Sequence, residues 1–186
     1  MSLTSVGFAQ DKNTKDIWTN DPGHSQLAFH VMHMGISKIH GQFNDFNVVV
    51  KSAKEDLSDL DITVEAKTQS INTSVEMRDN HLRSADFFEV EKFPTLNFVS
   101  TSVVPNGDNF AKLYGYLTIK GIKKPVELDV IHYGAYTDPQ SGNRIAGFQI
   151  VGTIKRSDFG VGSGFASTII GDEIHINANM EFIKSK

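Results

Sequence analysis

Apolar and polar residues alternate at every second position through most of this chain, and this pattern restricts it to β structure. Between Ile174 and Phe182, for example, apolar side chains alternate with His, Asn and Glu. Because successive side chains of a strand point to opposite faces, each such segment has one apolar face to bury. Eight strands of this kind predict an all-β fold in which an antiparallel sheet closes into a barrel. The segments begin at or near Ser25, Lys38, Leu60, Leu96, Leu113, Val126, Phe148 and Ile174.

The second of these segments does not alternate throughout. Phe43 is followed by Phe46, an odd number of positions later, so the two apolar side chains cannot share a face of a regular strand. This slip predicts a bend or a bulge near Gly41 or at Asn44-Asp45.

One stretch, residues 70–94 between the third and fourth segments, has helical spacing. Thr73 and Glu76 match a capping box, which predicts a short helix that begins at Ser74. Arg78 falls on the apolar face of that helix, where burial without a partner is costly. We expect the segment to cover or brace one end of the barrel, with Arg78 bound to a carboxylate, a carbonyl or a ligand head group. The other residues on this face are Met77, His81, Leu82, Ala85 and Phe88.

Composition excludes several classes of function. The net charge is −4 and no run of like charge occurs, so we expect no binding to nucleic acid. The chain has no cysteine, which excludes disulfides, thiolate nucleophiles and zinc–thiolate sites. No apolar run has the roughly 18 residues of a transmembrane helix, so we expect no stable membrane insertion.

The amino-terminal residues 1–16 are expected to be a disordered leader before a single barrel domain, residues 17–186. Within the leader, Thr4–Gln10 has the small residues that precede a secretory cleavage site, which predicts a periplasmic or secreted protein whose signal peptide has been removed. A merely disordered amino terminus explains the same residues equally well.

The histidines and Arg156 are the candidates for polar chemistry. His30 and His33 are an odd number of positions apart and face opposite sides of a strand, so we expect no metal site and no cofactor. His33 and His132 share faces with apolar residues and meet either a ligand group or a carbonyl oxygen. Arg156 is either paired with a carboxylate such as Asp158 or free to bind an anion. No motif or carboxylate pair indicates a catalytic residue.

Five segments carry a more specific pattern. In order they are DPGHSQLAFHVMHMGISKIHGQF, SINTSVEMRDNHLRSADFFEVEKFP, LTIKGIKKPVEL, IKRSDFGVG and IIGDEIHI. Together they resemble the YceI family of bacterial lipocalin-like proteins, from Trp18 to Phe182. The resemblance implies an eight-stranded antiparallel lipocalin-like barrel with a short helix between strands three and four, which holds a polyisoprenoid or isoprenoid quinone in an apolar tunnel. It also implies export to the periplasm, and family members include homodimers.

We therefore predict a non-enzymatic protein that binds, transports or sequesters a long-chain isoprenoid lipid or quinone. Two alternatives remain: an isomerase or hydrolase with His33 or His132 as its base, and a dimeric interaction module with a filled core. The predicted head-group residues are His33, Arg78, His81 and Arg156. The predicted tunnel residues are Phe29, Val31, Phe43, Phe46, Phe98, Leu117, Leu128, Val130, Phe148 and Ile150.

Overall fold

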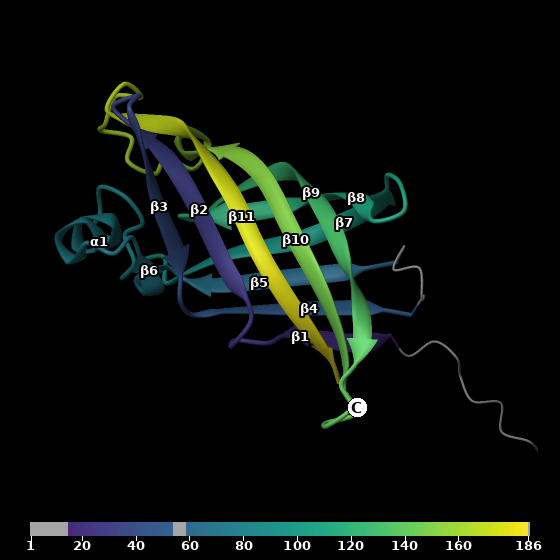
Figure 1. Ribbon diagram of the computed structural model, residues 1–186. Coiled ribbons are helices and arrows are strands. Elements are labelled where there is room, and N and C mark those ends of the chain that lie inside the picture. Colours follow the sequence, from purple (N-terminus) through teal and green to yellow (C-terminus); the bar gives the residue numbers. More distant parts are fainter. Residues whose placement is uncertain (1–14, 54–58, 186) are drawn as a thin grey trace, which may run out of the picture.

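The computed structural model describes residues 15–53 and 59–185, which form antiparallel strands around a long interior (Figure 1). Short 3-10 helices, η1 (Thr68–Ser70) and η2 (Arg156–Phe159), and one α-helix, α1 (Glu76–Arg83), lie between strands. The strands are β1 Asp16–Asn20, β2 Gln26–His33, β3 Ser37–Phe43, β4 Phe46–Ser52, β5 Asp61–Lys67, β6 Ile71–Asn72, β7 Thr95–Pro105, β8 Phe110–Ile119, β9 Ile122–Thr137, β10 Arg144–Lys155 and β11 Ile170–Lys184.

Eight of these strands close into a ring. β1 pairs with β4 on one side and with β11 on the other, and every pairing in the ring is antiparallel. The ring runs β1-β4-β5-β7-β8-β9-β10-β11 and returns to β1. This closure confirms the predicted eight-stranded antiparallel barrel, which leaves no free edge in the ring itself.

β2 and β3 lengthen one side of the barrel beyond the ring. β1 pairs with the last residues of β11 and β2 with its earlier part, so the two strands lie end to end along β11. β3 and β4 also follow one another, with Asn44 and Asp45 between them. The predicted second strand is therefore two strands, interrupted at one of the two predicted places. β1 was not predicted, because five residues are too short to show the alternation.

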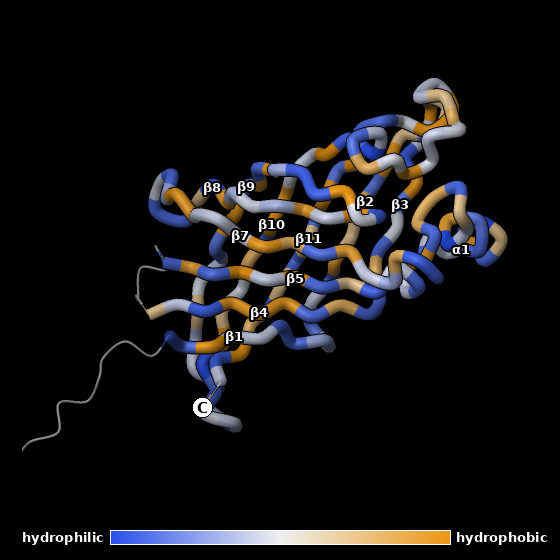
Figure 2. The backbone as a smooth tube through the Cα atoms, turned by 180° about the vertical axis from the view of Figure 1, so that it is seen from behind, coloured by the Kyte–Doolittle hydropathy of each residue, from blue (hydrophilic) through white to orange (hydrophobic). Residues whose placement is uncertain are grey.

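The alternation of the sequence gives the barrel its two faces. Figure 2 shows hydrophobic and hydrophilic residues following one another along β4, β5 and β7. The inward positions supply the core, which includes the buried side chains of Val48, Phe98, Leu113, Leu117 and Leu128. Among the residues that the structure describes, no helix is long and apolar enough to cross a membrane.

The start of the helix differs from the sequence-based expectation. α1 begins at Glu76, two residues after the predicted start. Ser74 has a φ of 64° in the left-handed region, so the backbone cannot enter a right-handed helix there. The hydroxyl of Thr73 donates to Asp79 Oδ1 and caps no helical turn, so the predicted capping box was wrong.

The apolar face of this segment is also shifted from the predicted one. Met77 is 83% exposed, whereas Leu82 and Phe88 pack into the core. Phe87, the neighbour of Phe88, is buried as well, because the chain leaves the helix at Arg83 and turns both aromatic rings toward the barrel. Figure 1 shows α1 and β6 beside one end of the barrel, whereas β11 ends at the other.

Candidate functional site

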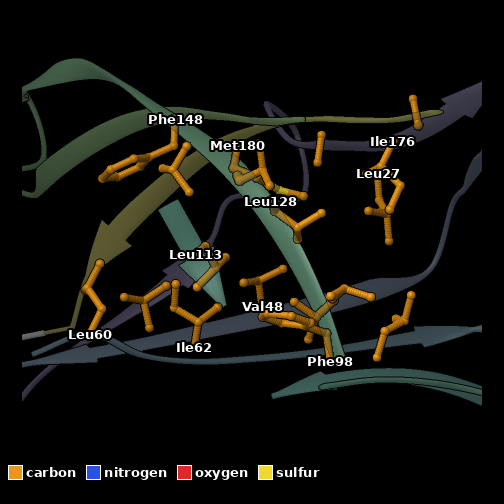
Figure 3. A pocket seen from close by; sticks show the side chains of 18 of the residues that line it. Leu27, Val48, Leu60, Ile62, Phe98, Leu113, Leu128, Phe148, Ile176 and Met180 are labelled. Atoms are coloured by element: carbon orange, nitrogen blue, oxygen red, sulfur yellow. The ribbon is translucent and has the colours of Figure 1, made fainter. Parts of the chain in front are cut away.

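The interior of the barrel holds a cavity of about 830 Å³. This volume lies in the upper part of the range of about 300–1,000 Å³ that is usual for small-molecule sites. The lining is predominantly apolar and comes from strands all around the ring; Figure 3 shows side chains such as Leu113, Leu128 and Ile176 directed into it. A continuous cavity of this size contradicts the alternative of an interaction module with a filled core.

Nine of the ten predicted tunnel residues line this cavity. The exception is Phe46, which is partly buried and packs against the core but does not belong to the lining. The nine are Phe29, Val31, Phe43, Phe98, Leu117, Leu128, Val130, Phe148 and Ile150. Their contact with a ligand remains a prediction.

The glycines near this apolar face make room for aromatic rings of the barrel. A Cβ atom at Gly115 would lie 2.4 Å from the Phe98 ring, and one at Gly41 would lie 2.5 Å from the Phe29 ring. Both rings therefore lie across a glycine of the neighbouring strand. The glycines shape the lining by letting these phenylalanines pack closely against the backbone.

The floor of the cavity, which we define as Phe87, Phe88, Phe159 and Val161, closes the end near α1. All four line the cavity, and Phe159 is only 1% exposed. Phe87 and Phe88 come from the loop that follows α1, whereas Phe159 and Val161 come from η2 and the residues after it. Two segments far apart in the sequence therefore seal this end of the barrel.

Arg156 holds the second of these segments together. Its side chain is 6% exposed and donates five hydrogen bonds, all to backbone carbonyl oxygens. The sequence-based alternatives, a pairing with Asp158 or a free cation for an anion, were both wrong. Five acceptors already occupy the guanidinium donors, so Arg156 lines the cavity as part of its wall. The acceptors are the carbonyl oxygens of Val161, Gly162, Phe165, Ile170 and Gly171.

The other predicted head-group residues lie outside the cavity. Arg78 donates from Nε to the hydroxyl of Thr73 and from Nη2 to its carbonyl oxygen, both at 2.7 Å. His81 Nε2 lies 3.0 Å from a carboxylate oxygen of Asp86, and His33 ends β2. None of the three predicted residues lines the cavity, so residues 70–94 act as a brace and do not form a head-group site.

The opposite end of the barrel carries a different set of polar residues, which includes Asp108 and Asn109 of the β7–β8 turn. We call Asp16, Arg144 and Lys184 the mouth collar. They stand at the first residue of β1, the first of β10 and the last of β11, and all three line the cavity. Lys184 Nζ lies 2.6 Å from Asp16 Oδ2. Phe110, which also lines the cavity at this end, is 54% exposed, so the cavity reaches solvent here.

Arg144 differs from the other arginines of the site. Within residues 15–53 and 59–185, no acceptor forms a hydrogen bond or an ion pair with its guanidinium. It is exposed and faces the cavity from the mouth, where Lys184 is already neutralised by Asp16. The sequence contained a signal for this residue, because Arg144 lies two positions before the inward-facing Ala146 on the same strand.

His132 lies between the collar and the aliphatic part of the cavity. Its ring stacks on Phe148 with 4.7 Å between the ring centroids, and both residues line the cavity. Its Nε2 is buried and has no hydrogen-bond partner within the described ranges. No carboxylate in these ranges orients the ring, whereas a histidine that acts as a general base is normally held by such a group.

The outer face of the barrel carries a row of three histidines. Spacing within one strand could not predict this row, because each histidine lies on a different strand. His175, His30 and His40 occupy paired positions on β11, β2 and β3. The ring centroids of His30 and His175 are 4.6 Å apart, and those of His30 and His40 are 5.5 Å apart. Burial, and then the charges of Lys38 and the two neighbouring histidines, lower the pKa of His30 below its ordinary 6.5.

Comparison with known proteins assigns the chain to a family. A family model described as a YceI-like domain matches residues 18–182. The chain belongs to the YceI-like family. Over 169 residues it is 36% identical to a UPF0312 protein of Staphylococcus aureus, covering 89% of this chain and 96% of that protein.

Solved structures place this YceI-like chain among barrels of the same architecture. The YceI protein of Campylobacter jejuni has a TM-score of 0.76 at 30% identity, covering 83% of this chain and 90% of that one. Burkholderia cenocepacia BcnA has a TM-score of 0.77 at 23% identity, covering 87% and 98%. A polyisoprenoid binding domain from Saccharophagus degradans has a TM-score of 0.69 at 13% identity, covering 90% and 98%. The last two show the fold alone.

Proposed function

We propose that this YceI-like protein is a non-enzymatic carrier that binds a polyisoprenoid or isoprenoid quinone inside the barrel, for transport or sequestration. The observation that carries the proposal is the apolar cavity of about 830 Å³, which is lined by the buried residues of the floor at one end and reaches solvent beside Phe110 at the other. A site of this shape suits a long chain that enters from one side. The ligand class is that of the Saccharophagus domain with the same fold.

The energetics favour an unbranched or methyl-branched apolar chain. Burial contributes about 0.8 kcal/mol for each CH₂ group removed from water, so a chain of several isoprene units gains affinity without any polar contact. The floor residues Phe87, Phe88, Phe159 and Val161 are apolar, and backbone carbonyl oxygens already occupy the donors of the nearby Arg156. The tail of a prenyl chain matches this surface.

Binding can be measured through Trp18, the single tryptophan of the chain, because it lines the cavity. Protein stripped of bound lipid should change its emission when geranylgeraniol is added, and native mass spectrometry of gently purified protein should detect a bound lipid. A stripped protein that binds neither prenols nor prenylquinones would contradict the proposal.

A pair of variants tests whether the cavity is the binding site. Val130→Phe fills part of it, whereas Val99→Phe places the same side chain at a position that is 51% exposed and outside the lining. Prenol affinity should fall in the first variant and stay unchanged in the second, with both variants folded by circular dichroism. Equal affinities in both would place the ligand elsewhere.

The enzyme alternative finds no support beyond the presence of His132 in the cavity. Within the described residues, no carboxylate orients the ring of His132 or of His33. Two further parts of the proposal depend on other measurements. Export rests on Thr4–Gln10, which lies outside the described residues, and cell fractionation tests it. Homodimer formation is tested by sedimentation at several protein concentrations.

A further inference from the structure

The two ends of the cavity differ in the hydrogen bonding of their arginines. At the sealed end, five backbone carbonyl oxygens surround the guanidinium of Arg156, which is 6% exposed. At the open end, Arg144 faces the cavity with no partner among the described residues. An additional acceptor can therefore bind at the mouth but not at the floor.

Desolvation leads to the same conclusion. An anionic group carried to the floor would lose its hydration among phenylalanine rings, which costs several kcal/mol when no donor replaces the water. At the mouth collar, the same group keeps part of its hydration and meets an unpaired guanidinium. Arginine is suited to this contact, because its planar fork matches two oxygens of a phosphate or carboxylate.

Aromatic residues at and next to the collar also suit an amphiphile. Trp18 is the register partner of Lys184 in the collar and lines the cavity, and farther along the barrel His132 stacks on Phe148, which also lines it. Aromatic side chains with a polar atom tolerate both the polar and the apolar part of an amphiphile. From mouth to floor, the lining changes from the charged collar to a predominantly apolar interior that ends at the phenylalanines of the floor.

We propose that the ligand is an amphiphile with an anionic head, a phosphate or a carboxylate, which binds Arg144 at the mouth while its chain runs toward Phe87, Phe88 and Phe159. The proposal rests on the carrier function above and specifies the polarity and charge of the ligand. The head at the mouth stays accessible to solvent, so a partner can reach it without opening the floor.

Trp18 allows the orientation to be measured directly, because it lies two residues from Asp16 of the collar. Two stearate probes are compared, one with a nitroxide near its carboxylate and one with a nitroxide near its methyl end. The carboxylate-end nitroxide should quench Trp18 more strongly. Stronger quenching by the methyl-end nitroxide would overturn the proposed orientation.

The role of Arg144 is tested by two affinities of the protein, one for geranylgeranyl phosphate and one for the uncharged geranylgeraniol. The first divided by the second measures the contribution of the phosphate. Arg144→Gln should lower this ratio about tenfold, the loss expected for one charge-assisted contact. Lys155→Gln, at the other end of the same strand and outside the lining, should leave the ratio unchanged. An unchanged ratio in Arg144→Gln, or an equal loss in both variants, would overturn the assignment.

A second comparison distinguishes a fatty acid from a prenyl phosphate as the source of the anionic head. Palmitate and geranylgeranyl phosphate are titrated into the same protein, and the head-group assignment stands if Arg144→Gln weakens whichever of them binds. Binding of palmitate without any prenyl compound would refute the isoprenoid part of the carrier function and leave the orientation in place. Failure of all these probes to bind would refute both.

Discussion

Removal of the Arg156 guanidinium gives the sharpest test of how the sealed end is built. Arg156→Met keeps much of the length of the side chain but leaves five backbone carbonyl oxygens without their donor. A hydrogen bond to a charged group contributes about 1.5–3 kcal/mol, so five of them correspond to a gross loss of at least ~7 kcal/mol. Water and relaxation of the surrounding loop recover part of this.

The net loss expected for Arg156→Met is about 3–5 kcal/mol, the usual cost of removing one member of a buried charged network. For a chain of this size, about 1 kcal/mol lowers the Tm by roughly 2–4 °C, so the Tm should fall by about 10 °C. Urea unfolding followed by far-UV circular dichroism measures the free energy of unfolding. An m value equal to that of the wild type would show that both proteins expose the same surface on unfolding, so that their free energies can be compared.

Two further variants make this experiment specific. Arg156→Lys keeps the charge and three of the donors, so its stability should lie between those of the wild type and Arg156→Met. Arg144→Met is the matched control, because this arginine has no partner among the described residues, and its stability should change by less than about 0.5 kcal/mol. A structural role of Arg156 is refuted if Arg156→Met is within about 1 kcal/mol of the wild type in stability and loses ligand binding instead.

Three other changes probe the barrel wall, the cavity and the outer face. Gly115→Ala places a Cβ 2.4 Å from the Phe98 ring and should destabilise the protein by about 1–3 kcal/mol in urea unfolding; unchanged stability would show that the ring moves freely. His132→Phe removes an unpartnered buried nitrogen while keeping the stacking on Phe148, so the free energy of unfolding should rise by about 1 kcal/mol. His30 has a lowered pKa, so below pH 6.5 the folded chain binds fewer protons than the unfolded chain and stability is lost as the pH falls. His30→Gln should therefore reduce the decrease in the urea midpoint between pH 7.5 and 5.5, and an equal decrease in both proteins would contradict the assignment.

The strands of the barrel could be predicted because their signal is local. One apolar residue at every second position is sufficient to define both a strand and its inward face, and this is why nine predicted residues line the cavity. β1 escaped the prediction because a five-residue strand shows too few repeats. The helix start was wrong because the left-handed φ of Ser74 depends on contacts of Asn72 and Asp79 that the capping pattern does not contain.

The roles of the arginines could not be predicted, because their acceptors are assembled by the fold. The five carbonyl oxygens around Arg156 belong to the loop between η2 and β11, whose path no residue pattern specifies. Arg78 and Thr73 are only five positions apart in the sequence, yet their contact requires the backbone conformation at Ser74. For Arg156 the expected partner was a carboxylate or an anion, and five carbonyl oxygens bind it instead. For Arg78 a carboxylate, a carbonyl or a ligand head group was expected, and the carbonyl oxygen of Thr73 is one of its two acceptors.

Proximity to solvent explains why an arginine stabilises the wall at the sealed end of the cavity, whereas an arginine at the mouth has donors that no described residue occupies. A guanidinium in the sealed end would be unstable without protein acceptors, so the fold supplies five of them and leaves none of its donors for a ligand. At the mouth, water hydrates Arg144, and no protein acceptor is required there. Water molecules are readily exchanged for the oxygens of a phosphate or carboxylate, whereas backbone carbonyls are not. An anionic head is thus accommodated at the mouth without disturbing the hydrogen bonds that close the floor.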